Sequence, residues 1–211
     1  MKNKKLYAII GNPIAHSLSP ILHNYWFNKY NIEANYSLID VEDHNLQSVI
    51  DKIKSKELHG INVTLPYKQK IIPHLDRLIN DARLTNSVNT IYLDNTNTVV
   101  GENTDVYGLQ AAYLKEIVSE NNKKALVIGA GGVSPSVIFS LKKSNIQNIS
   151  IVNRTHDKSI FLKKKFSFLN IINWKSLKEE ISNFDIIINA TSLGLKNGQE
   201  FQFNFDNIKK I

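Results

Sequence analysis

The pattern of hydrophobic and polar residues along the first half of the chain predicts strands and helices that follow one another in alternation. Residues 5–10 form a short, mostly apolar segment, and apolar and polar residues roughly alternate over 35–41, as in strands. Apolar residues three or four positions apart predict helices over 20–30 and 45–54. Gly60 to Leu65 is a third alternating strand. Strands and helices in this order are typical of a parallel sheet with crossover helices.

The second half of the chain has a different pattern. A helix is predicted from Asp105 to about residue 120, with its apolar face formed by Val106, Leu109, Tyr113 and Ile117. Beyond it, short apolar runs without alternation predict parallel strands covered on both faces, at 125–128, 149–152, 170–172 and 185–190. The sequence therefore predicts an α/β protein with one domain over residues 1–104 and another over 105–211.

The stretch from Gly60 to Lys68 brings polar groups to the end of the third strand. Alternation separates its side chains into two faces, one with Ile61, Val63 and Leu65 and the other with Asn62 and Thr64. Pro66 cannot continue a central strand, so Lys68 is expected near the start of a new element. A lysine beside two polar side chains is arranged like a catalytic acid or base. A solvated lysine in a turn is the alternative.

Three other polar residues lie at predicted helix starts. Ser19 followed by Pro20 is a good N-cap and first-turn pair, and Ser17 lies two residues before Ser19. Hydroxyl and amide groups at a helix N-terminus favour an anion such as a carboxylate. Asp105 opens the helix between the two halves, where a carboxylate suits the helix dipole. Capping alone is the alternative role for Ser19 and for Asp105.

Composition excludes several classes of function. The chain of 211 residues contains no cysteine, and its 6 histidines have no metal-binding spacing, so no metal is expected. The apolar runs are too short to span a membrane. The start of the chain reads as a first strand rather than a signal peptide, which makes the cytoplasm the expected location.

The net charge of +7 does not indicate nucleic-acid binding. Lysines are spread along the chain, and arginine, which usually carries bidentate recognition of bases and phosphates, occurs only as Arg77, Arg83 and Arg154. The charge supports at most a mildly favourable field for an anionic substrate and a phosphate-bearing cofactor.

A glycine-rich turn follows the first strand of the second half. Its residues are Gly129, Ala130, Gly131, Gly132 and Val133, and a helix begins directly after them. A strand, a glycine-rich turn and a helix form the dinucleotide-binding arrangement, in which amides at the helix N-terminus meet the pyrophosphate. The pattern departs from GxGxxG because Ser134 takes the third glycine position.

The end of the next strand favours NADP over NAD. An NAD site would place Asp or Glu there to accept from the ribose hydroxyls, whereas this chain has Asn153, Arg154 and Thr155, with Lys158 one turn further on. A cation with hydroxyl support fits a 2′-phosphate. Surface exposure without a ligand is the alternative for Lys158.

Seven motifs together resemble the shikimate dehydrogenase family in order and spacing. They are residues 11–20 (GNPIAHSLSP), 62–68 (NVTLPYK), 88–90 (VNT), 101–105 (GENTD), 129–132 (GAGG), 153–155 (NRT) and 189–192 (NATS). The resemblance implies a substrate-binding domain followed by a Rossmann-like NADP-binding domain. It also implies reversible NADPH-dependent reduction of 3-dehydroshikimate to shikimate, on the way to chorismate and the aromatic amino acids.

The resemblance implies roles for individual residues. Ser17 and Ser19 hold the substrate carboxylate, and Asn62, Thr64, Asn89 and Asp105 lie around the ring and its hydroxyls. Lys68 and Asp105 form the catalytic pair, and Thr191 joins the cofactor-binding residues. An ammonium group within hydrogen-bond reach of the ketone can donate a proton and stabilise the developing alkoxide. A close lysine and aspartate titrate as a coupled pair, so the formal proton carrier stays open.

The sequence also departs from the family pattern. Asn86 and Ser87 stand where the family usually has Gly-Ala, and Leu195 stands where a methionine is usual beside the nicotinamide. The family continues beyond the position of Ile211 with strands and helices that carry a substrate-binding glutamine, so a truncated second domain is expected. A quinate/shikimate dehydrogenase and a ligand-binding remnant without turnover are the alternative functions. A homodimer is compatible with the sequence.

Overall fold

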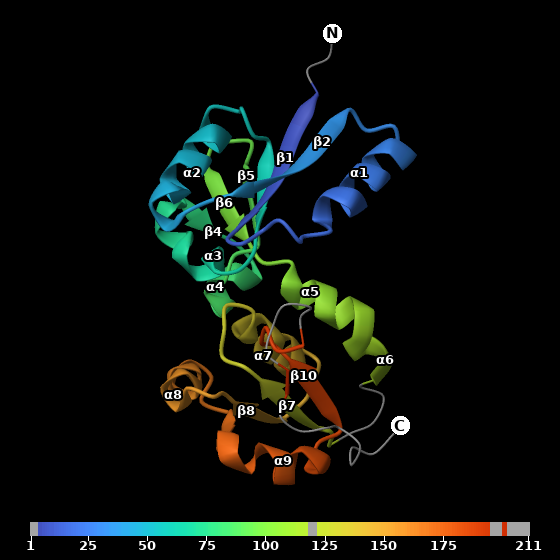
Figure 1. Ribbon diagram of the computed structural model, residues 1–211, viewed down its shortest axis with the longest axis vertical. Helices are drawn as coiled ribbons and strands as arrows, with labels where there is room; N and C mark the ends of the chain where they lie inside the picture. The colour runs from blue at the N-terminus through green and yellow to red at the C-terminus, as the bar shows by residue number, and fades with distance from the viewer. Residues whose placement is uncertain (1–3, 118–121, 195–199, 202–211) are drawn as a thin grey trace. The chain divides into compact units, whose positions relative to one another are not determined.

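The computed structural model describes residues 4–117, 122–194 and 200–201. The chain divides into two compact units, Met1–Thr104 and Asp105–Ile211 (Figure 1). Each unit has its own sheet and its own hydrophobic core, and each is described by itself. The α/β fold class predicted from the sequence is confirmed.

The first unit is built on a six-stranded sheet in the order β2-β1-β3-β5-β6-β4. Its strands are β1 (Lys5–Gly11), β2 (Ala34–Asp40), β3 (Gly60–Val63), β4 (Arg77–Leu78), β5 (Thr90–Leu93) and β6 (Val99–Glu102). β1 pairs in parallel with β2 and β3, as the alternating strand and helix patterns predicted. β5 runs antiparallel to β3 and to β6, so the sheet is mixed.

Helices cover both faces of this sheet. The elements between its strands are α1 (Ser19–Lys29), η1 (Asp43–Asn45), α2 (Leu46–Lys54), α3 (Tyr67–Lys70), η2 (Ile72–His74) and α4 (Asp81–Thr85). The apolar side of α2 packs on one face, against Ala8, Ile10, Ile61 and Val63 among others. Phe27 of α1 packs on the other face, against a small cluster that contains Ile9 and Tyr36, and α1 lies beside β2 (Figure 1).

Two sequence predictions for the first unit are wrong in detail. Leu65 was expected on the same face as Ile61 and Val63. These two are buried, but β3 ends at Val63 and Leu65 is 64% exposed, because alternation fixes a face only while the strand continues. Ser19 was expected as the N-cap of α1, but the helix begins at Ser19 and Leu18 precedes it. The Oγ of Ser17 accepts from the amide of Ser19 instead, at 3.3 Å.

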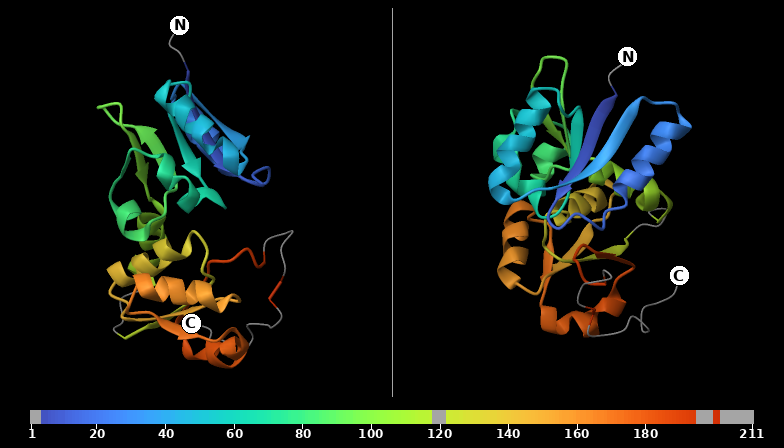
Figure 2. Two further views of the ribbon diagram at one scale, coloured as in Figure 1. Left: turned by 90° about the vertical axis from the view of Figure 1, so that its left-hand side faces the viewer. Right: turned by 45° about the horizontal axis from the view of Figure 1, so that its top comes forward.

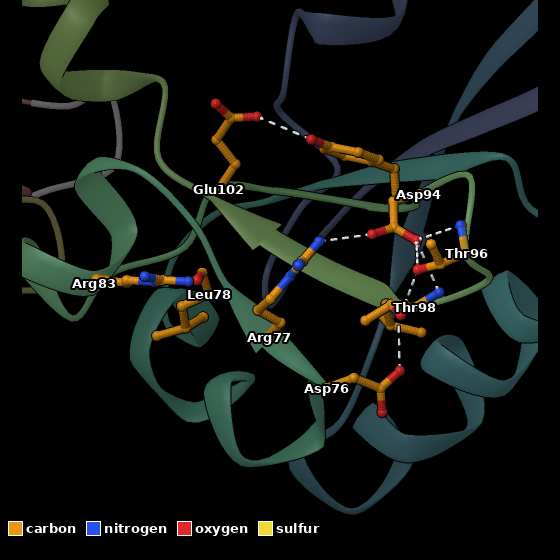
Figure 3. Close-up of polar contacts among 10 residues, drawn as sticks. Asp76, Arg77, Leu78, Arg83, Asp94, Thr96, Thr98 and Glu102 are labelled. Atoms are coloured by element: carbon orange, nitrogen blue, oxygen red, sulfur yellow. Dashed lines mark hydrogen bonds and ion pairs between the residues drawn. The ribbon is translucent and has the colours of Figure 1, made fainter.

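The far edge of the sheet is held by carboxylates in turns (Figure 3). Asp94 lies at the turn between β5 and β6, where one oxygen accepts from the amide of Thr96 at 2.8 Å and the other pairs with Arg77 at 2.7 Å. Asp76 accepts from the amide of Val99 at 2.8 Å, and this bond is the main reason that the pKa of Asp76 is lowered. The amide of Asn97 donates to the carbonyl of Asp94 at 3.0 Å and closes this turn.

The second unit carries a parallel four-stranded sheet in the order β10-β7-β8-β9. Its strands are β7 (Lys124–Ile128), β8 (Asn148–Val152), β9 (Asn170–Ile172) and β10 (Ile186–Asn189). All four apolar runs predicted as parallel strands are confirmed. When β7, β8, β9 and β10 are numbered 1 to 4, the strand order across the sheet is 3-2-1-4. This is the arrangement of a doubly wound dinucleotide-binding fold, and the strand order reverses between β7 and β10.

Helices also cover both faces of this second sheet (Figures 1 and 2). They are α7 (Ser134–Lys143), α8 (His156–Lys165), η4 (Trp174–Ser176), α9 (Leu177–Glu180) and η5 (Ile181–Asn183). α7 and α8 contribute to the larger core cluster, through side chains such as Ile138, Leu141 and Leu162. Leu177 and Ile181 pack on the opposite face against Leu126 and Ile128.

The helix predicted from Asp105 is divided into three segments. α5 (Asp105–Leu109) is followed by η3, a π-helical turn (Gln110–Leu114), and by α6 (Lys115–Ile117). Tyr113, expected on the apolar face, is 63% exposed, and Leu114 is buried in its place. A π-turn adds a residue to the helical turn, which moves the buried face by one position. The side chain of Ile117 lies outside the described residues, as does the predicted contact residue Leu195.

Candidate functional site

In the first unit, backbone hydrogen bonds bring the sequence motifs to the carboxyl ends of β1 and β3. The amide of Thr64 donates to the carbonyl of Ile10 at 2.9 Å, and the amide of Asn12 donates to the carbonyl of Leu65 at 3.2 Å. A Cβ added to Gly11 would lie 2.8 Å from the Cγ2 of Thr64, so only glycine allows the two segments to approach this closely. Residues far apart in the sequence thus meet at the carboxyl ends of β1 and β3.

Lys68 lies in the first turn of α3, directly after the strand end, as predicted. Its carbonyl accepts from the amide of Val88 at 2.8 Å, which joins the segment of Lys68 to that of Asn89. The side chain of Tyr67 is buried, and its hydroxyl donates to the carbonyl of Val41. Because the neighbouring tyrosine anchors α3 in the core, the backbone of Lys68 has a fixed position.

Ser17 and Ser19 lie together at the start of α1. Their hydroxyl oxygens are 3.2 Å apart, and the amide of Ser17 donates to the carbonyl of Ile14 at 2.9 Å. Both serines are partly exposed. The structure places the two hydroxyls side by side at a helix N-terminus, and their role in binding an anionic group stays a prediction.

Asn62 lies on the face of β3 opposite to the buried Ile61 and Val63. Its Oδ1 accepts from the hydroxyl of Tyr36 at 2.6 Å. Its Nδ2 donates to the carbonyl of Asn89 at 3.1 Å and to the Oγ1 of Thr90 at 3.2 Å. Asn62 is therefore held in a single orientation by Tyr36 of β2, by Thr90 of β5 and by Asn89, the residue before β5.

Asn89 connects two motifs that are apart in the sequence. Its Oδ1 accepts from the amide of Thr104 at 3.0 Å, and its Nδ2 donates to the Oγ1 of the same residue at 2.9 Å. Asn103 donates to the carbonyl of Ser87 at 2.8 Å. Asn89 thereby fixes the backbone directly before Asp105, the first residue of α5.

Asn86 has left-handed backbone angles, with φ of 52° and ψ of 46°, at the end of α4. The substitution of Asn for the family's glycine is tolerated there because asparagine enters this region more readily than most residues.

In the second unit, the glycine-rich turn lies at the carboxyl end of β7 and against the end of β10. Gly129 has φ of +113°, and a Cβ there would lie 2.6 Å from the Cγ2 of Thr191. Gly131 differs, because the nearest atom to its added Cβ would be the Ala190 oxygen at 3.9 Å. The turn therefore sits where the strand order reverses, the usual ligand position in open α/β sheets.

Ser134, in the third glycine position, ties the turn together. Its buried hydroxyl donates to the carbonyl of Gly129 at 2.9 Å and accepts from the amide of Gly131 at 3.0 Å. The departure from GxGxxG is thus compensated by two hydrogen bonds that a glycine could not form.

Asn153 joins the turn after β8 to the glycine-rich turn. Its Oδ1 accepts from the amide of Ala130 at 3.1 Å, and its Nδ2 donates to the carbonyl of Thr155 at 2.8 Å. Arg154, Thr155 and Lys158 are all exposed beside it. On the other side of the glycine-rich turn, Asn189 fixes Thr191 by accepting from its amide at 3.0 Å.

The structure thus brings the predicted residues together in two groups. Ser17, Ser19, Asn62, Thr64, Lys68 and Asn89 belong to the first unit, and Asp105 and all predicted cofactor-binding residues belong to the second. Within the described parts of the chain, no cluster of metal-binding side chains occurs. None of the described helices is long and apolar enough to cross a membrane.

Comparison with known families decides the identity of this arrangement. A family model described as the shikimate dehydrogenase substrate binding domain matches residues 9–91. A second, described as shikimate / quinate 5-dehydrogenase, matches residues 112–196. The chain belongs to the shikimate dehydrogenase family. The resemblance seen in the sequence motifs is therefore confirmed over both halves of the chain.

Individual members of the shikimate dehydrogenase family match over nearly the whole chain. A protein of Pelagibacter ubique named shikimate dehydrogenase (NADP(+)) is 46% identical over 207 residues, which are 98% of this chain and 76% of that protein. The crystal structure of shikimate dehydrogenase from Aquifex aeolicus superposes with a TM-score of 0.89 at 36% identity, covering 99% of this chain and 77% of that one.

The enzyme of Thermus thermophilus, solved in complex with NADP(H) and shikimate, has a TM-score of 0.82 at 28% identity, and the match covers 97% of this chain and 75% of that one. The Pelagibacter ubique protein is named for NADP(+) and the Thermus thermophilus structure contains NADP(H), the cofactor that Arg154 and Thr155 predicted for this chain.

Several residues of the site escaped the sequence analysis. Tyr36, Thr90 and Thr104 hold Asn62 and Asn89, and Ser134 and Asn189 hold the two turns of the second unit. Ser134 was noted only as a departure from a motif, and Asn189 only as part of one. Tyr36 gave no signal, because a tyrosine in an alternating strand is typical of a core position.

Proposed function

We propose that this chain catalyses the reversible NADPH-dependent reduction of 3-dehydroshikimate to shikimate, in the pathway to chorismate and the aromatic amino acids. The observation that carries the proposal is the combination, in one chain, of a 3-2-1-4 dinucleotide-binding sheet with a first unit that gathers Asn62, Lys68 and Asn89 around the carboxyl end of β3. Residues 1–104 would bind the substrate and residues 105–211 the cofactor. The match to NADP-dependent relatives supports both assignments.

The second unit fits the cofactor in three respects. Among the described atoms, a Cβ added to Gly131 would approach only the Ala190 oxygen, at 3.9 Å, so a pyrophosphate can approach the backbone of Gly131. The helix α7 begins directly after the turn and directs its N-terminal dipole there. Arg154, Thr155 and Lys158 offer cations and a hydroxyl to a 2′-phosphate, and Thr191 borders the turn. NADPH, when bound, supplies the hydride that reduces the ketone.

The residues of the first unit would orient the substrate and manage its protons. Ser17 and Ser19 would donate to the substrate carboxylate, and Asn62, Thr64 and Asn89 would contact the ring hydroxyls. Lys68 would donate a proton to the oxygen of the ketone and stabilise the negative charge that develops on it. Asp105 would orient Lys68 and accept from the reacting hydroxyl, so that the two act as one coupled pair.

Quinate as a second substrate, a homodimeric assembly and a cytoplasmic location remain predictions of the sequence. For quinate, the family model that matches residues 112–196 carries both substrate names, shikimate and quinate. Measuring turnover of each acid with each dinucleotide separates the shikimate enzyme from the broader activity.

The test compares two lysines of the same short helix. Lys68→Ala should lower kcat for shikimate oxidation by about a hundredfold or more, because it removes the acid–base group, while NADPH affinity stays nearly unchanged. Lys70→Ala is the matched control, since Lys70 is exposed and pairs with Asp43 on the surface. Equal loss of turnover and NADPH binding in Lys68→Ala would show that Lys68 has a structural role instead.

A further inference from the structure

The side chain of Tyr36 connects two strands that are not neighbours. Tyr36 lies in β2 and Asn62 in β3, and β1 separates them in the sheet. Two strand spacings amount to about 9–10 Å, so the phenol must extend over β1 to place its hydroxyl 2.6 Å from the Oδ1 of Asn62. It crosses on the face that carries Ile9, the register partner of Asn62.

Tyr36 itself is fixed from several sides. The side-chain amide of Asn24 in α1 accepts from the Tyr36 amide at 2.9 Å and donates to its carbonyl at 2.8 Å. The ring of His23 stacks on the phenol, with centroids 4.2 Å apart and planes 7° from parallel. Burial raises the pKa of Tyr36, so the hydroxyl keeps its proton at neutral pH and remains a donor.

The hydrogen bonds of Asn62 leave little of its amide for a ligand. An asparagine amide has two N–H donors and an oxygen with two lone pairs. Both donors are used, by the carbonyl of Asn89 and the Oγ1 of Thr90, and Tyr36 occupies one lone pair of the oxygen. Among the described residues this leaves a single acceptor position on Oδ1.

The same bonds continue toward the second predicted substrate contact. The hydroxyl of Thr90 accepts from Asn62 and donates to the Oδ1 of Asn89 at 3.0 Å, and Asn89 in turn accepts from the amide of Thr104. One connected set of hydrogen bonds therefore orders both asparagines, and it begins at the phenol of Tyr36.

We propose that Tyr36 is a positioning residue that fixes the Asn62 amide so that Asn62 can only accept a hydrogen bond from a substrate hydroxyl. The proposal rests on the proposed shikimate dehydrogenase function and refines it. Asn62 would then select for a ligand with a hydroxyl donor at this place, and a ligand with only an acceptor there would leave two lone pairs facing each other. Tyr36 acts through Asn62 and does not itself touch the substrate.

The test removes single hydroxyl groups from two tyrosines that are register partners. Tyr36→Phe keeps the ring in its cluster and removes only the donor to Asn62. Tyr7→Phe is the matched control, because Tyr7 pairs directly with Tyr36 and belongs to the same cluster. We expect Tyr36→Phe to raise KM for shikimate about three- to tenfold, the effect of one hydrogen bond, and to leave KM for NADP unchanged. Tyr7→Phe should change neither KM.

A spectroscopic measurement reads the positioning without turnover. The side-chain NH₂ resonances of Asn62 should shift in Tyr36→Phe and stay unchanged in Tyr7→Phe. If shikimate is not oxidised by the parent chain but these resonances shift, the positioning stands and the proposed function fails. Unshifted Asn62 resonances overturn the proposal. The proposal is also overturned if Tyr36→Phe raises KM for shikimate as much in an Asn62→Ala background as it does in the parent chain. The phenol should have no effect on this KM once Asn62, its hydrogen-bond partner, is gone.

Discussion

Replacing Gly129 by alanine tests the turn on which the cofactor site depends. The φ of +113° is unfavourable for a residue with a side chain, at a cost of about 1–3 kcal/mol. The new Cβ would lie 2.6 Å from the Cγ2 of Thr191 and 2.9 Å from the carbonyl oxygen of Ala190, and such overpacking costs about 1–3 kcal/mol more. The free energy of unfolding of the second unit should therefore fall by about 2–6 kcal/mol.

Two further glycines provide matched controls for this prediction. A Cβ at Gly108 in α5 meets no described atom within 4 Å. Gly108→Ala should therefore raise the free energy of unfolding by about 0.5–1 kcal/mol, because alanine has a higher helix propensity than glycine. Gly131→Ala should change stability by less than about 0.5 kcal/mol, since its Cβ approaches no described atom closer than 3.9 Å. It should nevertheless raise KM for NADP, because the Cβ occupies the space that the pyrophosphate needs.

The assay is urea unfolding followed by the fluorescence of Trp174, which lies in the second unit. The chain has 2 tryptophans, so the series is best made in a Trp26→Phe background. Gly129→Ala with the parent's stability would refute the described turn. Gly131→Ala that loses as much stability as Gly129→Ala, with an unchanged KM for NADP, would refute the separation of a structural glycine from a ligand-facing one.

Two further predictions concern charged residues. Arg154→Ala should raise KM for NADP about ten- to hundredfold and leave KM for shikimate unchanged, because it removes charge-assisted bonds to the 2′-phosphate. The control Lys164→Ala removes an exposed charge at the far end of α8 and should change neither KM. Equal effects of the two substitutions would contradict the proposed phosphate contact of Arg154. The pKa of Asp76 is lowered, chiefly by the amide of Val99 and also by Lys54. A carboxylate whose pKa is lower in the folded protein than in the unfolded chain stabilises the fold at pH values above the unfolded pKa. This stabilisation is lost as the pH falls through the folded pKa. Asp76→Asn should therefore destabilise the protein at neutral pH, and the difference in stability between variant and parent should shrink below about pH 4. Thermal unfolding across this pH range measures the difference, and a difference independent of pH would contradict the linkage.

The sequence predicted the sheets well because their signals are local. Mostly apolar runs such as 125–128 and 149–152 are typical of strands that a parallel sheet buries on both faces. The glycine-rich turn and the segment 153–155 were placed correctly because both follow such runs directly. Strand order between β7 and β10 was not predicted, since pairing across the sheet leaves no signal in either strand alone.

Other features depend on contacts that the sequence does not reveal. The apolar residues of α1 fit a helical period, yet Ile21, Leu22 and Tyr25 are exposed and no residue of this fully described helix is buried. Periodicity shows that a helix has an apolar face but not what covers it. The π-turn that exchanges Tyr113 for Leu114 is likewise a property of the folded backbone.

The candidate site shows the same division. Asn62 could be found because it lies in an alternating segment, and Lys68 because it follows Pro66, which ends that segment. Tyr36 could not, because it lies 26 positions from Asn62 and meets it only across an intervening strand. Side chains that position other side chains become visible only once the register of the sheet is known.

The most direct test of the proposed function is shikimate-dependent reduction of NADP⁺ by this chain, followed by the absorbance of NADPH, with NAD⁺ in a parallel reaction and Lys68→Ala as the blank. We expect turnover with NADP⁺, much weaker turnover with NAD⁺, and in the blank a rate lower by about a hundredfold or more. NADPH binding without any shikimate-dependent turnover would contradict the central claim, and so would a marked preference for NAD⁺.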